Sequence, residues 1–370
     1  ASASDAIFAE NCNDAVHILY PEKLTEKAGF FLSNFPGDCL YAMKSNPHPV
    51  VLETLWDCGL RRFEVASLRE IEYIITHFPG AEIYFMHPIK SRQAIHFAYE
   101  QGVRNFAFDC LDELVKIEQE TGHARDLNLF LRIGVDQTNA AHPLSNKFGA
   151  TLLEAPLLLQ RAAANAAKIG VTFHVGSQCL EPISYVRAIE QVAHMLNQSG
   201  VEIDALDVGG GYPVYYPGME TPPLGDYFAA IEKALADNGF GRTQILCEPG
   251  RALVAESGTV AVRVEMRKDA NLYLNDGTYG ALFDAGTPAW NYPIDAVSAA
   301  EAGYPTKEVA PYKLYGPTCD SLDVMHGPFM LPSSIDEGDW ILFHHLGAYG
   351  HAMQTQFNGF YSDTTVAILP

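Results

Sequence analysis

Basic side chains are scarce in this sequence. Lys and Arg together number 24, against 45 Asp and Glu, so the formal net charge is -21. Nucleic acids and anionic membranes are bound through basic surfaces, and we therefore expect neither as a partner. A small cationic substrate is compatible with this charge.

Long apolar runs are missing as well, and no stretch is long enough to span a bilayer as a helix. The opening Ala-Ser-Ala-Ser-Asp-Ala has neither the basic nor the apolar segment of a signal peptide. No CxxC pair occurs, and the scattered, odd number of cysteines indicates free thiols in a reducing compartment. We therefore expect a cytoplasmic protein with no metal site. The seven cysteines are Cys12, Cys39, Cys58, Cys110, Cys179, Cys247 and Cys319.

Apolar residues, in contrast, make up 48% of the 370 positions, enough for a core larger than one typical domain. Short apolar runs alternate with amphipathic, helix-like segments such as 49–58, 68–77, 94–101 and 111–121. This repetition implies a parallel sheet, and eight strand-helix units close it into a (β/α)8 barrel of TIM type. The predicted strands are 39–43, 62–65, 83–86, 105–108, 127–133, 171–175, 205–208 and 244–247.

The pattern changes after about Arg251. Strand-like runs at 258–265, 272–275, 340–344 and 364–369 are separated by Gly- and Pro-rich loops, without clear helices between them. This predicts a second, mostly β domain, and the strand-like run 15–19 could pair into it. We expect a barrel over residues 20–257 and a β domain formed by 1–19 and 258–370.

In such a barrel the reactive groups lie just past the carboxyl ends of the strands. The first predicted strand ends in Tyr-Ala-Met-Lys-Ser-Asn, which places Lys44 at its terminus. Partial desolvation there would lower the pKa of the amine and make it nucleophilic. The ordinary alternative is a lysine whose ammonium reaches solvent while its stem lies on apolar surface.

His174 and Ser177 lie in Thr-Phe-His-Val-Gly-Ser-Gln, at the end of the sixth predicted strand. We expect His174 to point inward, either as a hydrogen-bonded core residue or as a flat ring that stacks on a planar ligand. A small hydroxyl three residues later would suit a ring that carries a phosphate.

Three glycines, Gly209, Gly210 and Gly211, end the seventh strand. Without Cβ atoms, their N–H groups could approach a phosphate closely, although a tight turn is the simpler explanation. The eighth strand ends in Cys-Glu-Pro-Gly-Arg, with Glu248 near Arg251. These two could form an ion pair. In a cofactor site the carboxylate would instead hold a ring nitrogen protonated while the guanidinium binds phosphate.

In the second predicted domain, Tyr-Gly-Pro-Thr-Cys-Asp-Ser-Leu-Asp places Cys319, Asp320 and Asp323 in one loop. This could be a solvated turn. The alternative is a thiol able to donate a proton beside a carboxylate able to hold a cation.

Together and in this order, these segments resemble the ornithine/diaminopimelate/arginine decarboxylase family of fold-type III pyridoxal-phosphate enzymes, from about Leu40 to Phe360. The resemblance implies an alanine racemase-like barrel and pyridoxal 5'-phosphate as cofactor. Lys44 would be the Schiff-base lysine, His174 the ring-stacking residue and Glu248 the partner of the pyridine nitrogen. The implied phosphate ligands are Ser177, Gly211, Gly250, Arg251 and Tyr349, and the further cofactor contacts are Glu64, Arg132, Gly209 and Gly210.

The resemblance also implies a homodimer with shared active sites. Cys319 and Asp320 would reach the barrel mouth of the other subunit, where Cys319 protonates the substrate carbon after CO2 has left. Lys147 and Asp323 resemble a pair that bridges the interface. Glu64, in Phe-Glu-Val-Ala-Ser, stands where relatives commonly have Asp.

The implied substrate is a basic amino acid, with ornithine, converted to putrescine for polyamine synthesis, favoured over lysine. Asp320 and the pair Phe283 and Asp284 would place two carboxylates around one distal ammonium. Phe stands where ornithine enzymes have Tyr, so lysine could be accepted as well. The alternatives are diaminopimelate decarboxylation, amino-acid racemisation, a catalytically inactive regulatory relative and an unrelated barrel enzyme for phosphorylated substrates.

Overall fold

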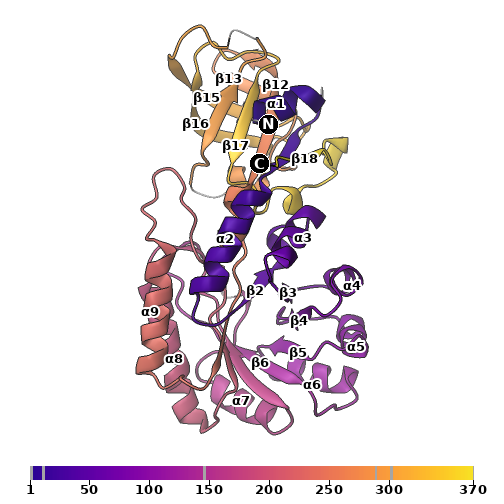
Figure 1. Cartoon of the computed structure of the whole chain (residues 1–370), viewed down its shortest axis with the longest axis vertical. Coiled ribbons are helices and arrows are strands. Elements are labelled where there is room, and N and C mark those ends of the chain that lie inside the picture. The colour runs from indigo at the N-terminus through magenta and orange to yellow at the C-terminus, as the bar shows by residue number, and fades with distance from the viewer. Residues whose placement is uncertain (1–2, 11–12, 145–146, 288–289, 301–302, 370) are drawn as a thin grey trace.

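The computed structural model of the chain describes residues 3–10, 13–144, 147–287, 290–300 and 303–369. Eight parallel strands close into a barrel in the order β10-β11-β2-β3-β4-β5-β6-β8, which fills the lower half of Figure 1. The predicted (β/α)8 fold is therefore confirmed. The strands are β2 (Asp38–Ala42), β3 (Arg62–Val65), β4 (Glu82–Phe85), β5 (Asn105–Phe108), β6 (Asn128–Arg132), β8 (Lys168–Thr172), β10 (Ala205–Asp207) and β11 (Gln244–Cys247).

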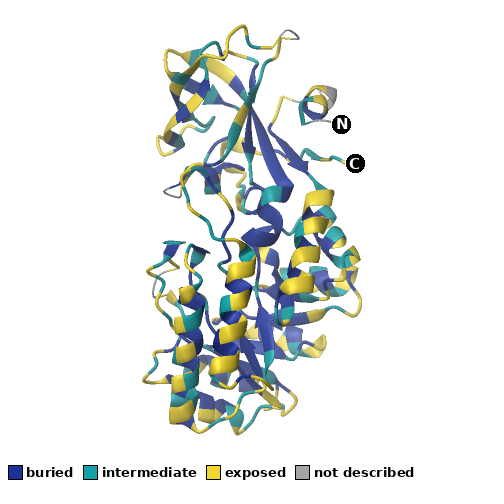
Figure 2. Cartoon of the chain, turned by 60° about the vertical axis from the view of Figure 1, so that its left-hand side comes forward, coloured by how far each residue is buried: buried dark blue, intermediate teal, exposed yellow. Residues whose placement is uncertain are grey.

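Helices surround the barrel with their apolar faces inward, so that each helix in Figure 2 is dark on one side and yellow on the other. In α4, Ser67 caps the first turn by accepting the N–H of Glu70 at 3.3 Å, and Ile71 and Ile74 are buried. The helices are α2 (Pro21–Asn34), α3 (Pro49–Asp57), α4 (Leu68–His77), α5 (Arg92–Glu100), α6 (Leu111–Glu120), α7 (Ala155–Ala163), α8 (Ile183–Ser199) and α9 (Leu224–Asp237). No helix within the described ranges is long and apolar enough to cross a membrane.

One predicted barrel strand is displaced. β8 covers Lys168–Thr172, whereas the apolar pattern predicts 171–175. Gly170 interrupts that pattern, and an added Cβ there would lie 2.5 Å from Cδ1 of Phe130 on the neighbouring strand. The chain then turns away at Gly176, where φ is +95°. His174 therefore lies beyond the strand end.

Alternation of side chains along the strands decides what fills the barrel. One layer of inward-pointing residues forms an apolar cluster of Leu40, Tyr84, Met86, Ala107, Phe130, Ala205 and Leu246. Two residues further along the same strands, the side chains of Ala42, Arg132 and Glu248 point inward again. These positions form the layer above the apolar cluster.

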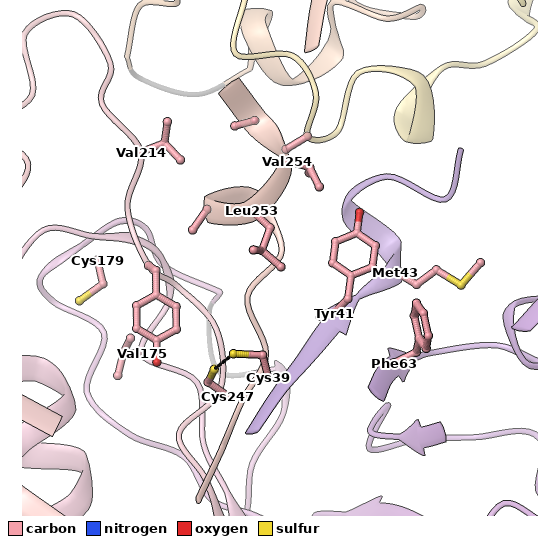
Figure 3. Packing of buried hydrophobic residues seen from close by; sticks show 14 of the residues in the cluster. Cys39, Tyr41, Met43, Phe63, Val175, Cys179, Val214, Cys247, Leu253 and Val254 are labelled. Atoms are coloured by element: carbon pink, nitrogen blue, oxygen red, sulfur yellow. Dashed lines mark hydrogen bonds between the residues drawn. The ribbon is translucent and has the colours of Figure 1, made fainter. Parts of the chain in front are cut away.

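Strands β2 and β11 close the barrel, with Cys39 opposite Cys247. Both thiols are buried and their Sγ atoms are 3.6 Å apart, as Figure 3 shows within the core. Six of the predicted free thiols lie in the described residues and are free, whereas Cys12 lies outside them.

The other large sheet lies above the barrel in Figure 1. Its strands follow the order β14-β17-β12-β13-β15-β16, and β1 pairs with both β12 and β18. The run 15–19 thus pairs as expected. The sequence pattern misses β14, β15 and β16, because residues such as Pro311, Gly327 and Pro328 interrupt the apolar alternation. The strands are β1 (Val16–Leu19), β12 (Gly258–Lys268), β13 (Asn271–Leu274), β14 (Ile294–Val297), β15 (Val309–Tyr315), β16 (Val324–Pro332), β17 (Trp340–His344) and β18 (Thr365–Ala367).

Candidate active site

A cavity of about 310 Å³ opens at the carboxyl ends of the barrel strands. The structure gathers most of the predicted site residues around it, since they follow different strands of one barrel. The predicted residues in its lining are Lys44, Glu64, Arg132, Lys147, His174, Ser177, Gly211, Glu248, Gly250, Arg251 and Tyr349. Met86, His87, Phe148 and Tyr212 also line it, although no motif in the sequence singles them out.

Lys44 lies in the short 3-10 helix Met43–Ser45, directly after β2. Its Nζ is 3.1 Å from Oε2 of the buried Glu64 on β3. Burial alone would lower the pKa of Lys44, but the charge of the Glu64 carboxylate, which also accepts a hydrogen bond from Lys44, opposes it, and the pKa is raised above its ordinary value. The expectation of a lowered pKa is therefore wrong, and the cavity holds Lys44 as an ammonium.

His174 presents a neutral ring to the cavity. Its Nδ1 accepts the N–H of Gly176 at 3.0 Å, so the ring proton is assigned to Nε2. Burial and the positive charges of Arg132 and Lys44 lower the pKa of His174 well below its usual value. An uncharged, flat ring in this position is suited to stacking on a planar ligand.

Glu248 follows β11 and lines the cavity. Burial and the carboxylates of Asp207 and Glu64 raise the pKa of Glu248 well above its usual value. An acid group that retains a proton beside the cavity is what the partner of a ring nitrogen requires. Asp207 ends β10, and no motif singles it out. The feature of the sequence that could have identified Asp207 is a charged residue at an inward-facing position of a buried strand.

Of the three consecutive glycines, only Gly211 lines the cavity. The N–H of Gly209 donates to Oδ1 of Asp207 at 2.8 Å, so it is not free to bind a phosphate. An added Cβ would lie 2.1 Å from a backbone carbonyl oxygen at Gly209 and 2.5 Å from another at Gly210. The assignment of Gly209 and Gly210 to cofactor binding is therefore corrected: they let the strand ends approach one another.

Arg251 lies between the cavity and Asp284. It begins α10 (Arg251–Val254), and its Nη1 and Nη2 donate to the Asp284 carboxylate on α11 (Phe283–Gly286) at 2.6 and 3.1 Å. Nη1 also donates to the hydroxyls of Tyr216 and Tyr292 at 3.0 and 3.1 Å. Nε is buried without a hydrogen-bond partner.

The charge of Asp284 is therefore already compensated, and Asp284 lies outside the cavity lining. Phe283 is also outside the lining and is partly exposed. Within one chain, the structure therefore places both residues outside the cavity near which the substrate ammonium was expected. The sequence shows an acid after an aromatic residue, but it does not show that Arg251 pairs with this acid.

Cys319 and Asp320 lie in the loop between β15 and β16, and the Cys319 thiol is exposed. The N–H of Cys319 donates to Oδ1 of Asn358 at 3.0 Å, and the hydroxyl of Tyr279 donates to Asp320. Neither residue borders the cavity of its own chain. Within one chain, the groups predicted for substrate chemistry therefore stay apart from Lys44.

Asp323 is buried and fully hydrogen-bonded. Its Oδ1 accepts the N–H and hydroxyl of Thr278 at 2.8 and 3.1 Å, and its Oδ2 accepts those of Thr318 at 3.0 and 2.7 Å. Four donors fill the acceptor positions of a carboxylate. Within one chain Asp323 is held by these threonines, and the expected pair with Lys147 across an interface stays a prediction. The Nζ of Lys147 lies 5.0 Å from the ring centroid of Phe148, at the cavity.

The cavity fits a phosphorylated aromatic aldehyde such as pyridoxal phosphate. Lys44 offers an amine, His174 a flat neutral ring and Glu248 a proton for a ring nitrogen. The unpartnered Nε of Arg251 and the backbone of Gly211, which lines the cavity, are suited to a phosphate group. A barrel with this set of groups at its mouth defines the class of fold-type III pyridoxal-phosphate enzymes.

Comparison with known proteins identifies the family. The family described as "Pyridoxal-dependent decarboxylase, pyridoxal binding domain" matches residues 22–255. The ornithine decarboxylase of Schizosaccharomyces pombe is 33% identical over 344 residues, 86% of this chain and 75% of that protein. The lysine/ornithine decarboxylase of Selenomonas ruminantium is 31% identical over 357 residues, 93% of this chain and 87% of that protein. The arginine decarboxylase structure from Paramecium bursaria Chlorella virus has a TM-score of 0.87 and 30% identity, covering 99% of both chains.

The chain belongs to the pyridoxal-dependent family of basic amino-acid decarboxylases, as the sequence motifs predicted. Its cofactor is pyridoxal 5'-phosphate.

Proposed function

We propose that this protein decarboxylates a basic L-amino acid, with ornithine preferred and lysine second. The observation that carries the proposal is the state of Asp320. It accepts the N–H of Leu322 at 2.8 Å and the hydroxyl of Tyr279, which are both uncharged donors. Its negative charge therefore stays available for a substrate ammonium, whereas that of Asp284 is compensated by Arg251.

The relatives support a basic substrate, since their names specify ornithine, lysine or arginine. We favour ornithine because Cys-Asp-Ser-Leu-Asp resembles the corresponding segment of ornithine enzymes. A carboxylate at Asp320 would also repel the second carboxylate of diaminopimelate.

Bound pyridoxal phosphate supplies the electron sink that allows the substrate carboxylate to leave as CO2. Among the residues of this chain, Lys44 would anchor the cofactor, His174 would stack on its ring and Glu248 would hold a proton at the ring nitrogen. Gly211 and Arg251 would face its phosphate. Glu64 would orient the amine of Lys44, which it already contacts.

We further propose a head-to-tail homodimer in which Cys319 and Asp320 complete the cavity of the other subunit. Exposed apolar side chains surround their loop, which supports a covered surface there. Leu322 is 73% exposed, Phe357 43% and Phe360 41%. In such a dimer Cys319 would donate the proton to the substrate α-carbon after CO2 has left. A two-fold axis would create two equivalent sites.

The barrel over residues 20–257 would then bind the cofactor, and the unit formed by 1–19 and 258–370 would supply the substrate residues across the dimer. Putrescine as product would place the protein in polyamine synthesis. The free thiols of the core are suited to a reducing compartment such as the cytoplasm.

The experiment is a measurement of CO2 release by the purified, cofactor-loaded protein from ornithine, lysine, arginine and diaminopimelate. We expect the highest kcat/KM with ornithine and the next highest with lysine. The variant Asp320→Ala should lose at least about 100-fold in kcat/KM with ornithine, because a charge-assisted contact is removed. Best turnover of arginine or diaminopimelate would refute the substrate assignment, and no turnover of any would indicate an inactive relative.

A further inference from the structure

Asp207 is a fully buried acid just below the cavity. It ends β10 two residues after Ala205 of the interior apolar cluster, and its side chain is 0% exposed. Oδ1 accepts the N–H of Gly209 at 2.8 Å. Oδ2 is buried, and no N–H or O–H group among the described residues donates to it. Burying a carboxylate oxygen without a hydrogen-bond donor costs folding free energy, so we expect a neighbouring group that can donate to it.

The side chain of Glu248 is the group that faces Asp207. The two residues end neighbouring strands, whose backbones are joined because the N–H of Glu248 donates to O of Gly209 at 2.9 Å. Their carboxyl groups interact as a hydrogen-bonded pair. Two carboxylates are both acceptors, so this contact is a hydrogen bond only when one of them carries a proton.

The geometry favours the negative charge on Asp207 and the shared proton on Glu248, because the N–H of Gly209 donates to Asp207. Burial, Asp207 and Glu64 all raise the pKa of Glu248, and the hydrogen bond to Asp207 raises it further. Burial also raises the pKa of Asp207, to about 6, while the hydrogen bonds from Glu248, Gly209 and Thr172 oppose that rise. At neutral pH the pair therefore consists of a neutral Glu248 that donates and an ionised Asp207 that accepts.

We propose that Asp207 is a positioning residue that keeps one proton on Glu248, ready for the ring nitrogen of the incoming cofactor. In the transfer, the O–H bond of Glu248 breaks and an N–H bond forms on the ring nitrogen, while the electron pair stays on the Glu248 carboxylate. The two acids together lose one proton and the ring gains it, so the total charge of the site does not change. This inference rests on the cofactor of the family and is independent of the substrate proposed above.

The competing explanation is purely structural, because Asp207 also caps the turn at Gly209. The variant Asp207→Asn separates the two roles. Asn keeps an oxygen for the N–H of Gly209, but its amide donates to Glu248 where Asp207 accepted. It also removes one negative charge and one acceptor, so the pKa of Glu248 would fall and its ionised form would be favoured.

The first test uses the cofactor-free protein and infrared spectroscopy of protonated carboxyl groups. At neutral pH the wild type should show a protonated carboxyl band that disappears in Glu248→Gln, and the same band should disappear in Asp207→Asn. The matched control is Asp204→Asn, at the exposed amino end of the same strand, where Asp204 accepts the N–H of Ile169 at 2.9 Å. It should keep the band. If Glu248→Gln leaves the wild-type spectrum unchanged, the proposal is wrong even if Asp207→Asn does not fold.

The second test compares binding of pyridoxal phosphate with that of its 1-deaza analogue, in which a C–H replaces the ring nitrogen. We expect Asp207→Asn to reduce the preference for pyridoxal phosphate about tenfold, the effect of roughly one lost charge-assisted contact, while affinity for the analogue stays within about twofold. Equal loss of both affinities would mean a structural role and overturn the proposal. Failure of the wild type to bind either compound would refute the cofactor site instead, and the infrared result would still decide the state of Glu248.

Discussion

Arg251 and Asp284 form a buried, bidentate ion pair at the edge of the cavity. The two contacts are 2.6 and 3.1 Å long, and the side chains are 7% and 15% exposed. The hydroxyl of Tyr292 also donates to Asp284. The pair connects the end of the barrel to the segment between β13 and β14 of the second sheet, so it contributes to how the two parts are joined.

Asp284→Ala should therefore act on stability and not on substrate choice. Removing one partner leaves Arg251 buried and uncompensated, which costs roughly 3–5 kcal/mol of unfolding free energy. We expect this loss in urea unfolding, with the ornithine-to-lysine ratio of kcat/KM unchanged. The control is Asp295→Ala, which removes an ion pair with His344. The Asp295 side chain is 76% exposed, so this substitution should change the unfolding free energy little. A shifted substrate ratio with unaltered stability would show that Asp284 contacts the substrate after all.

Asp323→Ala should destabilise the second sheet. Thr278 and Thr318 would lose the acceptor for four hydrogen bonds, and an added Cβ at Gly277 would lie only 2.2 Å from Asp323, so the loops close tightly on this carboxylate. We expect a loss of about 3 kcal/mol in unfolding free energy, independent of protein concentration. Lys147→Ala is the comparison. If it matched Asp323→Ala and both effects vanished on dilution, the two residues would pair across an interface.

The shared-site dimer predicts complementation. Lys44→Ala and Cys319→Ala should each be almost inactive alone. After mixing and subunit exchange at equal amounts, about half the dimers contain one subunit of each kind and one intact site, which gives about a quarter of wild-type activity. The measurement is CO2 release before and after exchange, with Lys44→Ala mixed with itself as the control. No recovery, although mass spectrometry shows mixed dimers, would mean that each site is built from one chain.

His17 should make the fold sensitive to mild acid. Burial, and then the charge of His351, lower the pKa of His17 from 6.5 to about 4, and its Nε2 has no hydrogen-bond partner. Because the unfolded chain binds the proton more tightly, stability is lost as pH falls from about 6.5 towards 4. His17→Gln should reduce that loss by roughly 3 kcal/mol, measured by urea unfolding at several pH values. The exposed His142→Gln should leave the pH dependence as in the wild type. An identical profile for both variants would contradict this assignment.

The barrel could be predicted because its signals are local. Each strand is a short apolar run, and each reactive group follows a strand end, so Lys44, His174 and Glu248 could be placed at one mouth without knowing any contact. The glycines at 209 and 210 were misread because a missing Cβ looks the same in sequence whether a phosphate or a backbone carbonyl fills the space.

The partners of Asp284 and Asp323 within the chain could not be predicted for a different reason. Both carboxylates are held by partners far away in the sequence or in another loop, and no periodicity reveals such a pairing. The raised pKa of Lys44 was missed for the same reason. Its burial was foreseeable from the neighbouring apolar residues, but the charge of Glu64 beside it depends on the pairing of β2 with β3.

The position of β1 sets an order of events during synthesis. This strand pairs with β12 and β18, from two late parts of the chain, whereas all eight barrel strands lie between Asp38 and Cys247. While a ribosome is still translating the residues after Cys247, β1 has an unpaired edge and the barrel is already complete in sequence. Contacts of such wide sequence separation form slowly, so assembly of the upper sheet should be the late, aggregation-prone stage of maturation.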